Sequence, residues 1–330
     1  MPSGKMPRFA GIPSLLRLPV VESMDSVPAC DVLLCGVPFD GGSTFRPGAR
    51  FGPRAVREAS GLARRFSAAL GIDIYEELRV ADGGDIAVMP YDIERALHTI
   101  AERAEALARS GVIGGFVGGD QTISLGVLRG IHRAKLRPVG LIHIDSHSNS
   151  SGPALGRDIH HGSVFKNAVE EGLVRPDCTI QVGIRGPYSN AECLAFALSH
   201  GFEVVNIDEV KWDLHAVISQ VRKVASRGPI YLSIDISAAD PAYAPGVGVP
   251  LPGGMTSWEL QQILRALVGA DIVAFDMVEI APQHDPAGIT AQLGVCVLQE
   301  VLSAIADTRR SVRPASSARS DSRRGQRVSP

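Results

Sequence analysis

Short runs of apolar residues alternate along this chain with longer segments in which apolar residues recur every three or four positions. The short runs are typical of buried strands, and the longer segments are typical of amphipathic helices. Alternation of this kind indicates an α/β fold, because parallel strands need crossover helices that cover both faces of the sheet. Predicted strands cover 30–38, 79–86, 111–117, 138–145, 179–185, 202–207, 229–236 and 272–280, and predicted helices cover 54–63, 91–110, 122–134, 191–199, 214–226, 256–267 and 290–305.

Both ends of the chain lack this alternation. Residues 1–28 are interrupted by Pro and Gly, which predicts an N-terminal arm on the surface. Residues 309–330 are rich in Ser, Arg and Pro and poor in apolar side chains, which predicts a disordered C-terminal tail. The stretch between them, 29–308, is predicted to be one α/β domain.

The composition narrows the classes of function. Of the 330 residues, 45% are hydrophobic and 21% are charged, and the formal net charge is −2, which is ordinary for a soluble globular protein. No basic patch is interleaved with aromatics, and no apolar run approaches the ~20 residues of a membrane span. We therefore expect no nucleic-acid partner and no membrane. The five cysteines are scattered and odd in number, which favours reduced thiols and a cytoplasmic location.

Polar clusters follow four of the predicted strands. Asp145, His147 and Asn149 alternate after the strand at 138–145, so their side chains leave it on the same side. In a parallel sheet, sites form beyond the carboxyl ends of the strands. The clusters are Gly118-Gly119-Asp120-Gln121, Asp145-Ser146-His147-Ser148-Asn149, the stretch 233–241, and Val278-Glu279-Ile280-Ala281-Pro282. Neither the spaced glycines of dinucleotide binding nor a phosphate-loop Lys-Ser/Thr pair is found, which argues against a nucleotide enzyme.

In this order and spacing, the four clusters resemble the ureohydrolase (arginase/agmatinase) family, and they are most similar to its agmatinase branch. The stretches 46–53, 181–186, 245–250 and 252–256 are similar too, so the resemblance covers about 30–307. It implies a three-layer α/β/α sandwich on a mostly parallel sheet (arginase-like). It also implies hydrolysis of guanidino compounds to urea and an amine by two manganese ions that share a hydroxide, and assembly into a homo-oligomer, a trimer or a hexamer.

Three of the six positions that hold metal in this family differ here. Gln121 replaces a histidine, and Asn149 and Ser237 each replace an aspartate. The remaining family ligands are Asp145, His147 and Asp235. Two carboxylates offset the charge of about one divalent ion, and neutral oxygens are weaker ligands for manganese than carboxylate or imidazole. We therefore expect an altered centre with one manganese ion or none.

The resemblance assigns roles for an agmatinase-like hydrolase that acts on a non-peptide C–N bond of a guanidino or amidine compound. His161 would carry a proton to the leaving amine, Glu279 would grip the planar cation, and Asp145 would hold the ion that activates water. Asp120 and Asp240 would orient the ligands.

Two alternatives stay open beside this hypothesis. The chain could be a catalytically silent relative that serves as a partner, regulatory or ligand-binding protein, with Gln121 hydrogen-bonded to Asp145 in an empty pocket. Alternatively, one of the serines near the site could act as a nucleophile with His147 or His161, although no nucleophile elbow is present. These serines are Ser146, Ser148, Ser150 and Ser151. We expect His143 to be packed at the end of its strand.

Overall fold

The computed structural model describes residues 7–21, 27–135, 137–187 and 192–312. Its sheet is formed by β1 (Val32–Val37), β4 (Val80–Asp85), β5 (Ile113–Gly118), β6 (Val139–Ile144), β7 (Val174–Ile184), β8 (Glu203–Asn206), β9 (Ile230–Asp235) and β10 (Ile272–Val278). The eight strands lie in the order β4-β1-β5-β10-β9-β6-β7-β8, and every neighbouring pair is parallel. A short antiparallel pair, β2 (Phe66–Ser67) and β3 (Ile72–Asp73), lies apart from this sheet.

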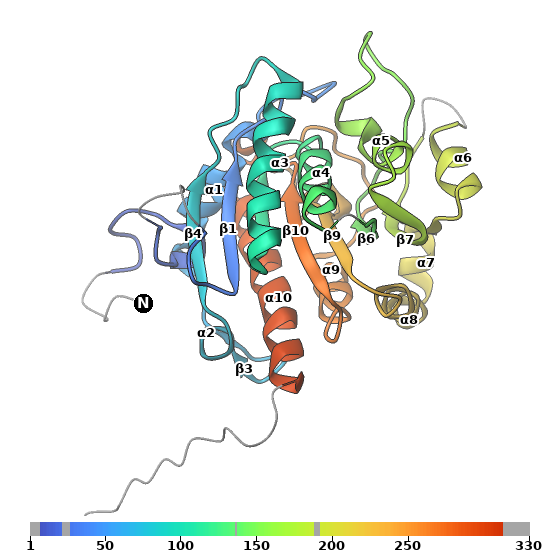
Figure 1. The fold of residues 1–330 in the computed structure, drawn as a ribbon. Coiled ribbons are helices and arrows are strands. Elements are labelled where there is room, and N and C mark those ends of the chain that lie inside the picture. The colour runs from blue at the N-terminus through green and yellow to red at the C-terminus, as the bar shows by residue number, and fades with distance from the viewer. Residues whose placement is uncertain (1–6, 22–26, 136, 188–191, 313–330) are drawn as a thin grey trace, which may run out of the picture.

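Helices cover both faces of the sheet (Figure 1). One face packs against α3 (Ile93–Ser110), α4 (Ile123–Lys135) and α5 (Val164–Glu170). The other packs against α1 (Gly52–Ala59), α8 (Leu214–Ala225), α9 (Ser257–Arg265) and α10 (Ile289–Val312). The remaining helices are α2 (Ile74–Glu77), α6 (Glu192–Ser199) and α7 (Ile207–Trp212). This arrangement confirms the predicted three-layer α/β/α sandwich.

The central strands are buried along their whole length because both faces are covered. Every residue of β1, β6 and β9 is buried. Such strands have almost no polar residue facing outward, so they read as continuous apolar runs. Asp145 and Asp235 come where β6 and β9 end, which places these carboxylates at one edge of the sheet.

Several elements differ from the sequence-based prediction. β7 begins at Val174 rather than 179, and α5 and α7 were not predicted. A six-residue helix such as α7 has too few turns for a periodic apolar pattern to emerge. It is fixed instead by its N-cap, where Asn206 accepts the backbone N–H of Glu209 and the Glu209 side chain accepts that of Asn206.

The predicted surface arm at 1–28 is wrong for its described middle part. Leu15, Leu16 and Leu18 are buried in the core beside α1, and the backbone N–H of Leu15 donates to Asp82. These three leucines add buried apolar surface to the core, and no periodic pattern in the sequence predicted their burial. Residues 1–6 and 22–26 lie outside the described residues.

The predicted boundary of the C-terminal tail is also wrong. α10 continues to Val312, and Arg309 pairs with Asp31 at 2.7 Å, so 309–312 are helical. The rest of the predicted tail, 313–330, lies outside the described residues. By length and composition alone, α10 is long and apolar enough to cross a membrane, contrary to the expectation from the sequence. However, 78% of its most apolar 18-residue stretch is buried inside the fold, as in a core helix.

Candidate functional site

The four polar clusters meet because their strands are neighbours. β5, β10, β9 and β6 lie side by side in the sheet, and all point the same way. Asp120 follows β5, Glu279 follows β10, Asp235 ends β9, and Asp145 follows β6. Chain segments more than 100 residues apart, such as Gln121 and Glu279, are thereby hydrogen-bonded to one another.

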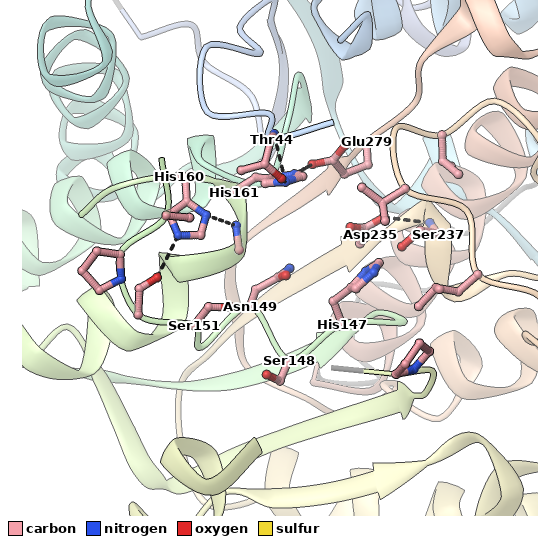
Figure 2. A pocket seen from close by; sticks show the side chains of 18 residues that line it. Thr44, His147, Ser148, Asn149, Ser151, His160, His161, Asp235, Ser237 and Glu279 are labelled. Carbon is pink, nitrogen blue, oxygen red and sulfur yellow. Dashed lines mark hydrogen bonds and ion pairs between the residues drawn. The ribbon is translucent and has the colours of Figure 1, made fainter. Parts of the chain in front are cut away.

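A cavity of ≈ 570 Å³ opens at this edge of the sheet (Figure 2). Four of the six family metal positions line it, namely His147, Asn149, Asp235 and Ser237. Gln121 and Asp145 are buried and are not part of the lining. The other lining residues are Thr44, Ser148, Ser151, Gly152, Pro153, Ala154, His160, His161, Gly162, Pro187, Val247, Val249, Leu251 and Glu279.

The carboxylate of Asp145 is surrounded by protein donors. Its Oδ2 accepts Nε2–H of His143 at 2.9 Å and the amide of Asn149 at 2.6 Å. Its Oδ1 accepts the backbone N–H of His147 at 2.9 Å and the hydroxyl of Ser237 at 3.1 Å. A carboxylate has about four lone-pair sites, and these four donors, with a longer contact from the Ser146 hydroxyl at 3.4 Å, fill them. Two of the four are Asn149 and Ser237, the residues that replace aspartates.

These donors set the protonation of Asp145. Burial by itself raises the pKa of a carboxyl group, but hydrogen bonds from His143 and His147 hold the pKa of Asp145 well below its ordinary value. His143 is packed at its strand end, as expected, and its Nδ1 accepts an N–H of Gln181 at 3.1 Å. The proton of the His143 imidazole is therefore left on Nε2, facing Asp145.

Gln121 turns away from Asp145, so the suggested hydrogen bond between them is wrong. The Gln121 side chain donates to Ser124 at 2.6 Å and to Ser233 at 2.8 Å. Both hydroxyls donate in turn to the buried carboxylate of Asp276, as does Tyr231. The amide thus belongs to a polar network beneath the cavity floor rather than to the cavity itself.

Asp235 has few partners. One of its oxygens, Oδ1, accepts the backbone N–H of Ser237 at 2.7 Å, and the Ser237 side chain is its other hydrogen-bonding neighbour in the described part of the chain. Burial, followed by the nearby charges of Asp145 and Glu279, raises the pKa of Asp235 well above its ordinary value. A cation in the cavity would stabilise its ionised form.

Glu279 and His161 form an ion pair at the cavity wall. His161 Nδ1 lies 3.0 Å from Glu279 Oε1, and its Nε2 lies 2.7 Å from Thr44 Oγ1. Burial lowers the pKa of His161, but the carboxylate of Glu279 outweighs it and raises this pKa to about 9. Glu279 has a φ of 68°, in the left-handed region that costs a non-glycine residue about 1 kcal/mol or more. Hydrogen bonds between its backbone N–H and Gly119, and between Gln121 N–H and Oε1, hold it there.

Asp120 and Asp240 both organise loops. Asp120 accepts the backbone N–H groups of Gly42 and Thr122, and burial, followed by the charge of Glu279, raises its pKa to about 7. Asp240 accepts the backbone N–H groups of 242, 253 and 254 and so fixes the loop that carries Leu251. Their predicted role in orienting metal ligands stays a prediction.

Comparison with known proteins identifies the chain. Residues 30–303 match the model of the arginase family. The chain is 40% identical over 308 residues to a guanidinopropionase from Pseudomonas aeruginosa, with 93% of this chain and 95% of that protein covered. It is 39% identical over 297 residues to a mitochondrial agmatinase from Gallus gallus, with 89% and 86% covered. The chain belongs to the arginase family.

The fold of a solved arginase-family structure agrees. The proclavaminate amidino hydrolase of Streptomyces clavuligerus superimposes with a TM-score of 0.86 at 34% identity, with 92% of this chain and 100% of that chain covered. The ureohydrolase resemblance and the arginase-like fold class are therefore confirmed. The relatives are named as hydrolases of guanidino or amidino compounds.

The residues of this arginase-family chain do not fit a pair of metal ions. Three anionic or imidazole ligands are missing, Gln121 points away, and the lone pairs of Asp145 are taken by N–H and O–H donors. In the described part of the chain, no three His, Cys, Asp or Glu side chains converge as a metal ion needs. A single ion at Asp145, His147 and Asp235 would have to displace Asn149 or Ser237 from Asp145.

Sequence reasoning missed two parts of the site. Thr44 lies in a glycine-rich loop more than 100 residues from His161, and no local pattern connects the two. Asp276 lies within an apolar strand, and this carboxylate among apolar residues was the sequence feature that could have indicated the buried network. Among the serines, Ser146 does contact His147 Nδ1 at 2.8 Å, but it is fully buried and does not line the cavity, so it is not placed to attack a ligand there.

Proposed function

We propose that this protein is a hydrolase that binds a guanidino compound in the cavity and cleaves a guanidino C–N bond with an altered, metal-poor centre. The observation that carries the proposal is the pair of carboxylates, Asp235 and Glu279, which reach one cavity from adjacent strands (Figure 2). Carboxylates recognise a planar guanidinium through charge-assisted hydrogen bonds. The names of its relatives support the same class of ligand.

Binding would use the carboxylate oxygens that the protein leaves open. Glu279 uses Oε1 for His161 and Gln121, while Oε2 accepts no hydrogen bond from any described residue. Asp235 uses Oδ1 for Ser237. Glu279 Oε2 would accept N–H groups of the guanidinium, and the bound cation would return the pKa of the nearby Asp235 toward its ordinary range while leaving Asp235 Oδ2 free for water.

Cleavage would use His161 as the proton donor. Its raised pKa of about 9 keeps it charged near neutral pH, and its Nε2 lies at Thr44 on the cavity wall. Water would add to the guanidino carbon, and His161 would pass a proton to the departing amine, which yields urea and the amine. Asp235 Oδ2 is the acceptor left in the cavity for a hydrogen of the attacking water.

A second candidate function is guanidino binding without catalysis. The observation that favours it is the filled hydrogen-bonding capacity of Asp145, which removes the carboxylate expected to hold a water-activating ion. In that case the same cavity would serve a sensor, a regulatory subunit or a partner protein.

The deciding experiment measures metal content and urea release on one preparation. The protein is purified with manganese supplied, its metal is counted per chain, and urea is followed across a set of guanidino compounds. Urea release with at most one ion per chain is the expected result, and it should vanish in Glu279→Gln. Two ions per chain would overturn the metal-poor centre. Binding without urea release would establish the second candidate.

A further inference from the structure

Five ionisable side chains line the cavity. Of the lining residues, Asp235, Glu279, His147 and His161 belong to the centre described above. The fifth ionisable residue, His160, is not available as a cation. Burial lowers its pKa, its Nδ1 accepts the N–H of Gly162, and its Nε2 donates to the carbonyl of Gly152.

The two arginines that lie behind the lining residues, Arg46 and Arg185, already donate their guanidinium N–H groups to backbone carbonyls. Arg185 is buried and donates to the carbonyls of Leu251 at 2.7 Å and Ser237 at 2.8 Å. Arg46 donates to Val247 at 2.7 Å and to Gly248 at 3.1 Å. These guanidinium groups hold the cavity wall in place from outside and do not line the cavity.

Much of the remaining lining is apolar, and one of its loops reaches the centre, because Gly248 lies beside Glu279 Oε2. Val247, Val249 and Leu251 come from one loop, and Pro153 and Ala154 come from another. Two of the lining residues are each followed in the chain by an exposed apolar residue. Phe45, after Thr44, is 71% exposed, and Leu155, after Ala154, is 85% exposed.

We propose that the ligand of this cavity carries its guanidinium as its only charge and has an uncharged, largely apolar tail. This inference rests on the proposed guanidino binding. A carboxylate tail would add a third anion beside Asp235 and Glu279, and no described lining residue offers it a cation. Among the described lining residues, an ammonium tail would find no carboxylate beyond those two. Removing either charge from water without a partner is costly.

Matched tails test the inference. n-Butylguanidine, agmatine and 4-guanidinobutyrate have tails that end in a methyl, an ammonium and a carboxylate. Their dissociation constants are measured by calorimetry on the full chain, and urea release is followed in parallel. n-Butylguanidine should bind at least about tenfold more tightly than either charged-tail compound, because an unpaired buried charge opposes binding.

The outcomes separate this inference from the proposed function. Equal or tighter binding of agmatine or 4-guanidinobutyrate would overturn the uncharged tail and leave guanidino binding standing. If none of the three compounds binds, guanidino binding fails and the inference falls with it. Tight binding of n-butylguanidine without urea release would support the inference and refute catalysis.

A designed gain of charge gives a second test. Ala154 lines the cavity from a surface loop, so a longer side chain is tolerated there more readily than in the core. Ala154→Arg should bind 4-guanidinobutyrate about tenfold more tightly than the unaltered protein, through a new ion pair. Ala154→Gln, of similar length without charge, should show no such gain. No gain in the arginine variant would mean that the tail does not run along this wall.

Discussion

Asp145 and Asp235 stand at the ends of neighbouring strands, and both are buried, but their surroundings differ sharply. Asp145 accepts four hydrogen bonds between 2.6 and 3.1 Å. Asp235 is hydrogen-bonded only by Ser237 among the described residues and faces the cavity. Accordingly, the pKa of Asp145 is lowered by its hydrogen bonds, while the pKa of Asp235 is raised by burial and by nearby anions.

Under the proposed function, an arginase-family site would lose metal ligands and keep its shape. Asn149 and Ser237, at positions where the family resemblance implies aspartate, donate to Asp145, so hydrogen bonds would balance its charge in place of cations. Asp235 and Glu279 themselves keep the carboxylates that the family resemblance implies at their positions. They remain an acceptor surface for a cationic ligand.

The largest effect on stability is expected when the two donors beside Asp145, Asn149 and Ser237, are both replaced by aspartate. Asn149→Asp with Ser237→Asp removes two donors and crowds three buried carboxylates together, which should lower the free energy of unfolding by about 3–5 kcal/mol without metal. Added Mn²⁺ should recover part of this loss. Chemical denaturation in EDTA and in Mn²⁺ measures both. Ser199→Asp, on an exposed helix end, is the control, with a change of roughly 0.5 kcal/mol or less. Unchanged stability in EDTA would show that the donors at Asp145 do not matter.

The next largest effect is expected on ligand affinity, when the charge of Glu279 is removed. Glu279→Gln removes the charge that faces a guanidinium and breaks the pair with His161, so the affinity for n-butylguanidine should fall by roughly 30-fold or more. Calorimetry measures the loss. Glu170→Gln, which removes an exposed carboxylate paired with Lys166, is the matched control and should bind normally. Full affinity in Glu279→Gln would remove the basis of the proposed function.

A smaller effect is expected from Gln121→His, which restores the family histidine. Because the amide donates to Ser124 and Ser233 rather than to the cavity, the substitution should cost about 2 kcal/mol of stability and bring no metal binding. Gln121→Met, of similar size without donors, should cost about as much. Urea denaturation with and without Mn²⁺ tests this. A Mn²⁺-dependent stabilisation of the histidine variant would contradict the orientation of Gln121.

The smallest effect is the pH dependence of the His161–Glu279 pair. The pKa of His161 is raised from 6.5 to about 9 in the folded protein, so its contribution is complete below pH 6.5 and disappears as the pH rises through 9. The full shift corresponds to at most about 3 kcal/mol across this window, and we expect about 1–2 kcal/mol, the value of a charge-assisted hydrogen bond. Denaturation at a series of pH values should show a step that is absent in His161→Asn. An identical step in that variant would assign the titration to another group.

Much of the fold could be predicted from local sequence because strand and helix patterns are local. The apolar runs at 138–145 and 229–236 and the polar residue that ends each located β6, β9 and the edge of the site. Short elements such as α7 were missed because a few residues carry no readable period. The buried leucines near residue 15 were missed because a core contact made by an irregular segment has no period at all.

The sequence by itself determined the alternating α/β order and the family motifs, and through the family resemblance it predicted altered ligand positions at 121, 149 and 237. Only the tertiary structure decided what the substitutes do. Asn149 and Ser237 donate to Asp145, whereas Gln121 turns to Ser124 and Ser233. The physical reason is that residue type fixes whether a side chain can donate or accept, but its partner depends on which groups the sheet order brings within about 3 Å.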